Sequence, residues 1–175
     1  MLLGFFIFIL ITVTILAIFA GNYLWQKKEL KESMKNFSML IESGNFDNLS
    51  LMIYYVSPSR DTPYAYGVDD VIKFGGQIVI DGNDLKNHID LLNKISNVNL
   101  VPVTKKYDLN ARIYYVFENE ENGKIFDIVM WGYREDGKSI SIFINGIAVK
   151  PNDVFYDVIM PFLPESRAEQ LEKFK

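Results

Sequence analysis

The sequence predicts an α+β fold: an N-terminal transmembrane helix and stalk, then one domain built on an antiparallel β-meander. Three observations predict it. An apolar run precedes the first charged residue, Lys27; an amphipathic stripe follows the run; and strand-like segments are later joined by Asn-Gly and Asp-Gly turns. We expect a transmembrane anchor over residues 1–26, a helical stalk over 27–44 and one globular domain over 45–175. The domain is expected to hold about four to six strands packed by two or three helices.

The apolar run from Leu2 to Leu24 is long enough to cross a bilayer. A hydrocarbon core about 30 Å thick needs roughly 20 helical residues. Tyr23 and Trp25 come where the run ends, the depth at which amphipathic aromatic side chains are enriched. We therefore expect residues 2–25 to contact the lipid bilayer.

A cleaved secretory signal is the alternative reading of this run. Such a signal has a basic start, a shorter apolar stretch and small residues before the cleavage point. Here no Lys or Arg precedes the run, and the run is longer than a signal needs. The best cleavage point, after Ala20, has Ile18 where a small residue is preferred. These features favour an uncleaved anchor.

Lysines near the ends of the apolar run predict its orientation. Four of them follow it: Lys27, Lys28, Lys31 and Lys35. None precedes it, so the positive-inside rule places the soluble domain in the cytoplasm. The alternative is an extracytoplasmic domain, because long domains can be translocated in spite of the charge bias.

The stalk is predicted from a stripe of apolar residues at helical spacing. The stripe consists of Leu30, Met34, Phe37 and Ile41. Spacings of four, three and four place these side chains on one face of a helix, and Gly44 suits its end. The far end of the stalk is expected to dock on the domain. A dimerising coiled coil is disfavoured because it needs several heptads, and the segment supplies about two.

Seven strand-like runs follow, rich in aliphatic and aromatic residues: 49–56, 77–80, 100–104, 112–118, 124–134, 139–144 and 147–150. Pro102 suits the third run to the edge of a sheet. The last four runs are joined by Asn122-Gly123, Asp136-Gly137 and Asn145-Gly146, which supply the positive φ angles of hairpin turns. Alternation places Phe126, Ile128 and Met130 on one sheet face and Asp127, Trp131 and Tyr133 on the other.

Helical segments lie between and after these runs. A helical turn is expected over 71–74, starting near Asp69, and a helix over 84–95, capped by Asn83 or Asp81. The second helix would bury Leu85, Ile89, Leu92 and Ile95. A helical region begins near Pro151 and buries Val154, Phe155, Val158 and Ile159. A short amphipathic helix over 166–174 closes the chain.

Charge and composition exclude several classes of function. Residues 1–35 contain four Lys and two Glu, which leaves 14 basic and 20 acidic residues and a formal charge of −6 for the remainder. An acidic domain is repelled by phosphate backbones, so nucleic-acid binding is not expected. The chain has no cysteine, which excludes disulfides, thiol catalysis and cysteine metal sites.

No metal, cofactor or catalytic residue is predicted. His88 is the one histidine, so a typical zinc site cannot be built, and a helical surface position is the simpler reading. The segment Asp81–Asp84 differs from a calcium loop because Leu85 and Lys86 follow where a ligand and a glycine are required. Nucleotide-binding and nucleophile motifs are also absent from the sequence.

The predicted binding residues lie mainly in the longest irregular segment, 57–67, and just after it: Arg60, Asp61, Tyr64, Tyr66, Asp69 and Asp70. Aromatic side chains that also hydrogen-bond suit recognition of a peptide, glycan or protein. The alternative is a plain surface loop in which Asp69 caps the next helical turn. Trp131 and Tyr133 extend the predicted site on the mixed sheet face, where packing beneath a terminal helix is the alternative.

These observations favour a single-pass membrane-anchored protein whose domain is a tethered binding or regulatory module. The partner would be a protein or peptide. The alternative is a membrane-anchored hydrolase with a carboxylate site built from Asp61, Asp69 or Asp70, and a third reading is a purely structural tether. Enzyme activity is not favoured, because no motif in the sequence identifies a chemistry.

Overall fold

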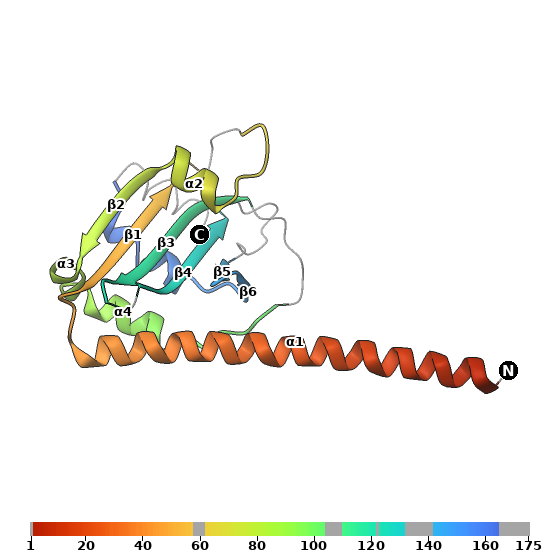
Figure 1. Ribbon diagram of the computed structural model, residues 1–175. Helices are drawn as coiled ribbons and strands as arrows, with labels where there is room; N and C mark the ends of the chain where they lie inside the picture. The colour runs from red at the N-terminus through yellow and green to blue at the C-terminus, as the bar shows by residue number, and fades with distance from the viewer. Residues whose placement is uncertain (1, 58–61, 104–109, 122, 132–141, 165–175) are drawn as a thin grey trace.

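The computed structural model describes residues 2–57, 62–103, 110–121, 123–131 and 142–164, of which residues 2–5 and 131 are described by backbone alone. Several predicted features lie outside these ranges: Arg60, Asp61, Tyr133, the Asp136-Gly137 turn and the helix over 166–174. Within the described residues the chain forms one long N-terminal helix and a six-stranded antiparallel sheet packed by shorter helices. The predicted α+β fold is therefore confirmed (Figure 1).

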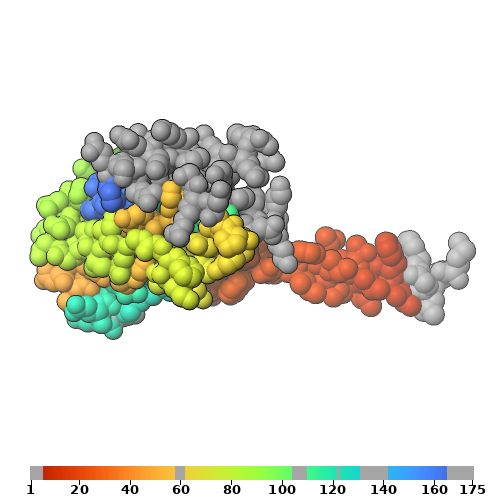
Figure 2. Space-filling view, turned by 90° about the horizontal axis from the view of Figure 1, so that it is seen from above, coloured from red at the N-terminus to blue at the C-terminus, as the bar shows by residue number. Residues whose placement is uncertain are grey.

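Helix α1, Leu2–Ser43, runs unbroken for 42 residues and has two different environments. Its first half is exposed and projects beyond the body of the molecule (Figure 2), and α1 is long and apolar enough to cross a membrane. In the second half the predicted stripe is confirmed, since Leu30, Met34, Phe37 and Ile41 are all buried in the main core. The stripe is buried along its whole length, so this half of α1 is a core helix of the domain.

The sheet has the strand order β2-β1-β3-β4-β5-β6, with every neighbouring pair antiparallel. The strands are β1 Leu49–Tyr55, β2 Gly76–Asp81, β3 Ala111–Asn119, β4 Gly123–Trp131, β5 Ile142–Ile144 and β6 Ile147–Val149. Strands β3 to β6 form the predicted meander. Its last turn uses Asn145 and Gly146, with φ of 49° and 75°, as the Asn-Gly pair predicts.

The shorter helices cover the two sheet faces unequally. They are α2 Val68–Phe74, α3 Gly82–Lys86, α4 Ile89–Ser96, α5 Val154–Asp157 and the 3₁₀ helix η1 Met160–Phe162. Leu85 of α3, Leu92 of α4 and Phe155 of α5 join the α1 stripe in the main core. Of these described helices, α2 alone, through Val71, belongs to the smaller core on the opposite face.

The predicted helix over 84–95 is wrong as a single element, because the chain forms two helices separated at Asn87 and His88. Asp81 is the N-cap of the first, and its Oδ1 accepts the backbone N–H groups of Asn83 and Asp84, both at 3.0 Å. His88 leaves helical geometry and packs edge-on against Phe162, with ring centroids 4.7 Å apart. The break turns Ile89 outward: it is 37% exposed although its periodicity predicted burial.

The predicted strand over 100–104 is also corrected. Among its described residues only Pro102 pairs, in an isolated bridge with Val149 of β6. Proline has no backbone N–H, so it cannot continue a ladder. The flanking backbone bonds, from Val103 to Ala148 and from Lys150 to Val101, are both 2.9 Å. The segment therefore lies along β6, the last strand of the sheet, as an edge segment rather than a strand.

Three aromatic rings join α1 to the sheet. The ring centroid of Phe37 lies 4.9 Å from that of Phe117 on β3 and 4.7 Å from that of Phe126 on β4. The rings of Phe117 and Phe126 are themselves 5.1 Å apart. All three side chains are fully buried, and offset or edge-on aromatic pairs add to the free energy of burial. We call these residues the phenylalanine cluster.

Replacing Phe37 by alanine is expected to lower the free energy of unfolding of the domain by about 3–5 kcal/mol, because it leaves a cavity between α1 and the sheet. The matched control is Met39→Ala, two residues away on the same helix, whose side chain is 57% exposed. Its expected effect is within about 0.5 kcal/mol. Chemical denaturation followed by tryptophan fluorescence measures both. Equal stabilities for the two variants would show that this half of α1 is not core.

Candidate functional site

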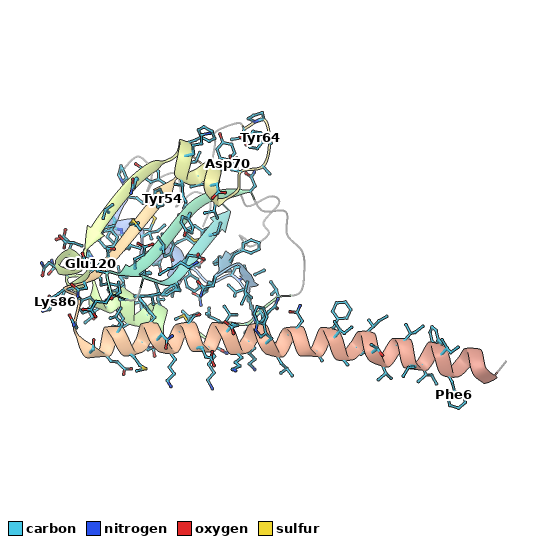
Figure 3. All side chains as sticks on the ribbon, viewed as in Figure 1. Phe6, Tyr54, Tyr64, Asp70, Lys86 and Glu120 are labelled. Carbon is cyan, nitrogen blue, oxygen red and sulfur yellow. The ribbon has the colours of Figure 1, made fainter. Side chains whose placement is uncertain are left out.

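Tyr64 and Asp70 lie together at the start of α2, at the side of the domain opposite α1 (Figure 3). Asp70 organises this region: its Oδ2 accepts the backbone N–H of Gly67 at 2.9 Å, and its Oδ1 accepts the hydroxyl of Tyr64 at 3.4 Å. The first bond is the return half of a capping box, which satisfies an N–H at the helix start. Asp70 lies three residues after the N-cap Gly67, a spacing that can be seen in the sequence. Its bond to Gly67 fixes the end of the loop that precedes α2.

Tyr66 is the buried centre of the loop. Its backbone N–H donates to Oδ1 of Asn110 at 3.1 Å, and its carbonyl accepts the N–H of Ala111 at 2.7 Å. Its ring lies between those of Tyr64 and Phe74, with centroids 5.6 and 6.0 Å away. The loop is therefore fastened to the start of β3.

Arg112 is a residue of this site that the sequence analysis missed. Its side chain is only 3% exposed, and its guanidinium carbon lies 5.5 Å from the ring centroid of Tyr66. It also donates to Oγ1 of Thr62 at 3.5 Å. A cation over an aromatic face is attracted by the ring quadrupole, more strongly where water is excluded. The available signal was one basic residue at the start of an otherwise apolar and aromatic strand.

Tyr54 and Tyr114 were also missed, and they extend the site across the sheet. Their rings stack with centroids 5.9 Å apart on β1 and β3, and both pack against the smaller core that contains Tyr66. Gln77 donates to the hydroxyl of Tyr54 at 3.2 Å. Partial burial, and then the charges of Asp127 and Glu118, raise the pKa of Tyr114 to about 12.

The exposed and half-buried aromatic side chains that pack around Tyr66 or the small core that contains it are called the tyrosine face: Tyr54, Tyr64, Phe74 and Tyr114. It lies on the side of the sheet away from the main core. Tyr64 is 53% exposed and Phe74 is 42% exposed, while Tyr54 and Tyr114 are half-buried. The tyrosine hydroxyls supply hydrogen-bonding groups on an otherwise apolar surface. The arrangement can make both apolar contacts and directional hydrogen bonds.

The remaining predicted site residues are not brought into this surface by the described part of the chain. Asp69 is exposed on the first turn of α2, and the reading in which it caps this turn is wrong, because Gly67 is the N-cap and Asp70 makes the capping bond. Arg60, Asp61 and Tyr133 lie outside the described residues, and Trp131 is described only as the last residue of β4. Both oxygens of the Asp70 carboxylate accept hydrogen bonds, one from the start of α2 and one from Tyr64. No observation in the described residues therefore favours the carboxylate hydrolase.

The chain matches no family model, curated protein or solved structure. Its function must therefore be inferred from its own residues and geometry.

Asp127 is the one buried acidic side chain among the described residues, and its contacts are structural. One oxygen pairs with Nζ of Lys124 at 2.6 Å, and the other accepts the N–H of Asn145 at 3.1 Å. Asn145 in turn donates to the hydroxyl of Ser33 on α1 at 2.9 Å. The network ties the β5–β6 turn to β4 and α1. Within the described residues no three acidic or histidine side chains group to hold a metal.

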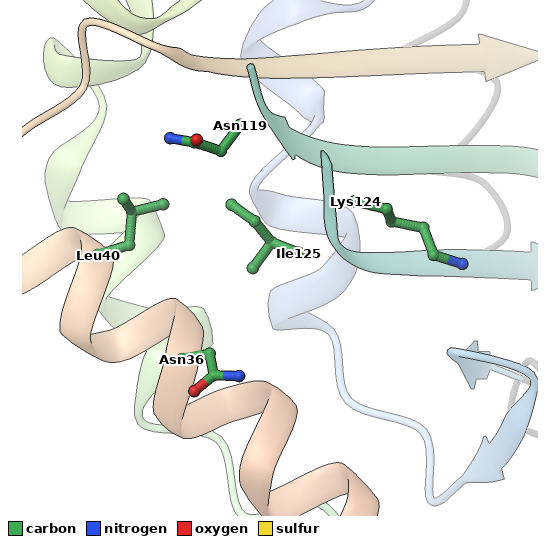
Figure 4. A pocket seen from close by; sticks show the side chains of 5 residues that line it. All are labelled: Asn36, Leu40, Asn119, Lys124 and Ile125. Carbon is green, nitrogen blue, oxygen red and sulfur yellow. The ribbon is translucent and has the colours of Figure 1, made fainter. Parts of the chain in front are cut away.

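A hollow of about 350 Å³ lies between α1 and the turn joining β3 to β4 (Figure 4). It is lined by Asn36, Leu40, Asn119, Lys124 and Ile125. The Lys124 side chain points away from the hollow, toward its partner Asp127. With its only cation used elsewhere, the hollow has no feature that identifies a ligand.

The carboxylate of Asp70 raises the pKa of the exposed Tyr64 hydroxyl above its ordinary value of 10, mainly by charge repulsion of the phenolate. Asp70→Asn removes that charge but keeps an oxygen for the cap, so the pKa of Tyr64 is expected to fall toward 10. Asp69→Asn is the matched control and is expected to leave it unchanged, because Asp69 is not among the groups that shift it. NMR titration of ¹³C-labelled tyrosine measures both; equal shifts would contradict the assigned contact.

Proposed function

We propose that this protein is a single-pass membrane-anchored binding module that presents the tyrosine face to a protein or peptide partner. The observation that carries the proposal is the tyrosine face itself, a group of exposed and half-buried aromatic side chains on the sheet side opposite the α1 stripe. Burying such a surface against a partner is favourable, and tyrosine is enriched at protein interfaces.

The shape of the site supports recognition rather than chemistry. Tyr66 and Arg112 are buried and hold the surface from beneath, while Tyr64 and Phe74 expose large parts of their rings. Asp70 and Gln77 fix hydrogen-bonding groups beside the rings. A surface held in place before binding loses less conformational entropy when a partner docks.

Membrane attachment is supported by the length and apolar character of α1. The helix has no break between its exposed half and the half that packs in the core. An anchor built in this way holds the domain close to the bilayer without a flexible linker. The four lysines that follow the apolar run favour the cytoplasmic side.

The orientation is tested with a C-terminal tag on the full chain in intact cells. We expect the protein to remain in the membrane fraction after alkaline extraction, because an apolar span does not dissociate from lipid. We expect the tag to be protected from external protease until the membrane is permeabilised. Release by alkali would contradict the anchor, whereas digestion in intact cells would contradict only the cytoplasmic placement.

The partner is tested by photo-crosslinking in cells, with a photoreactive residue at Ala65, the exposed residue between Tyr64 and Tyr66, followed by purification in detergent. The double variant Tyr64→Ala/Phe74→Ala is expected to lower the yield of a specific crosslinked protein about tenfold or more. Truncating aromatic residues central to an interface costs at least about 1–2 kcal/mol each.

The matched control for this experiment is Met39→Ala/Ile89→Ala, which removes two exposed apolar side chains from α1 and α4, outside the tyrosine face. It is expected to leave the crosslink unchanged. A crosslink that survives the tyrosine variant, or that both variants reduce equally, would contradict a binding role for the tyrosine face.

A further inference from the structure

A second hollow, of about 330 Å³, lies between α1 and the segment that follows α4. The residues around it include Lys27, Leu30 and Lys31 of α1 and Val98, Asn99 and Leu100 of the following segment. The residues that line it therefore carry two ammonium groups and one amide beside aliphatic side chains. A few polar groups on a mainly apolar concave surface are typical of small-ligand sites.

The two lysines form a cationic pair with no acidic partner in the hollow. They lie four residues apart, so they project from the same face of α1. Neither makes an ion pair with any described residue, whereas Lys28 nearby pairs with Glu32 at 3.8 Å. Like charges at this spacing destabilise a helix. A bound anion would remove that repulsion.

The position of the pair along α1 identifies the anion. A helix rises 1.5 Å per residue, so Lys27 and Lys31 lie about 3 and 9 Å beyond Trp25, the aromatic residue that ends the apolar run. The headgroup layer on each side of a bilayer is about 5–8 Å thick. The two ammonium groups therefore bracket the depth at which lipid phosphates occur.

Charge complementarity supports the same ligand. The chain beyond residue 35 has a formal charge of −6. Such a domain would be repelled by an anionic membrane surface unless a basic region faced it. Lys27 and Lys31 supply that region where the domain comes closest to the apolar half of α1.

We infer that this hollow binds the phosphate-bearing headgroup of an anionic phospholipid from the membrane in which α1 is anchored. Lys27 and Lys31 pair with the phosphate oxygens, and the Asn99 amide is placed to donate to the headgroup. Val98, the half-buried aliphatic residue of the lining, packs against its glycerol carbons. The inference rests on the proposed membrane anchoring and is independent of the tyrosine face.

The test uses the full chain in nanodiscs that contain phosphatidylglycerol and phosphatidylcholine in equal amounts. Native mass spectrometry then counts the lipids that remain bound. The wild type is expected to retain one phosphatidylglycerol in preference to phosphatidylcholine. Lys27→Gln/Lys31→Gln is expected to lower that preference about 25-fold, since each lysine near an anionic surface contributes roughly a fivefold factor.

The matched control is Lys28→Gln/Lys35→Gln, which removes the same charge from the same helix outside the hollow. It is expected to lower the preference by less than about fivefold, because Lys28 is already paired with Glu32 and Lys35 lies about 15 Å beyond Trp25 along the helix. Equal losses in the two variants, or none in either, would overturn the site. Displacement of the lipid by excess inorganic phosphate or glycerol 3-phosphate would overturn the lipid assignment in favour of a soluble anion. A chain that does not stay in nanodiscs would overturn the anchoring itself, a result distinct from retention without preference.

Discussion

The phenylalanine cluster is the contact on which the rest of the structure depends. Phe37 of α1 packs against both Phe117 and Phe126, so the helix that begins as an exposed apolar segment ends as part of the domain core. Hydrophobic burial is the main favourable term in folding, and α1 contributes a four-residue stripe to it. The apolar half cannot tilt without moving the half that is packed on the sheet, because no break separates them.

This packing determines how the two sheet faces are used. Once α1, α3, α4 and α5 cover one face, the polar and aromatic side chains of alternate strand positions fall on the other. Among the described residues α2 covers the end of that face near Tyr66 and Val71, while the ring of Tyr64 is exposed and that of Tyr54 is half-buried. The binding surface we propose is thus a consequence of where the core helices dock.

Local patterns predicted most of the fold. Alternation placed Phe126, Ile128 and Met130 on the buried face, and helical spacing identified the α1 stripe, because both signals lie within one element. Contacts between distant segments were not predictable in the same way. Arg112 meets Tyr66 only after the loop folds onto β3, and His88 breaks its helix while packing on Phe162. The sequence thus located Tyr64, Tyr66 and Asp70 but missed Tyr54 and Tyr114, which reach the site through strand pairing.

A continuous helix also constrains how the proposed module meets a partner. A domain on a flexible linker samples many orientations and loses that orientational freedom when it binds. A domain whose core contains the end of its own anchor helix, through Phe37, loses much less orientational entropy on binding. The tyrosine face then keeps a constant angle to α1, so its angle to the bilayer depends on the tilt of that one helix. Lys27 and Lys31 lie where this tilt is set, between the apolar half and the core half. A headgroup bound there would hold the helix against the domain at the membrane surface, and so orient the tyrosine face toward partners at the same membrane.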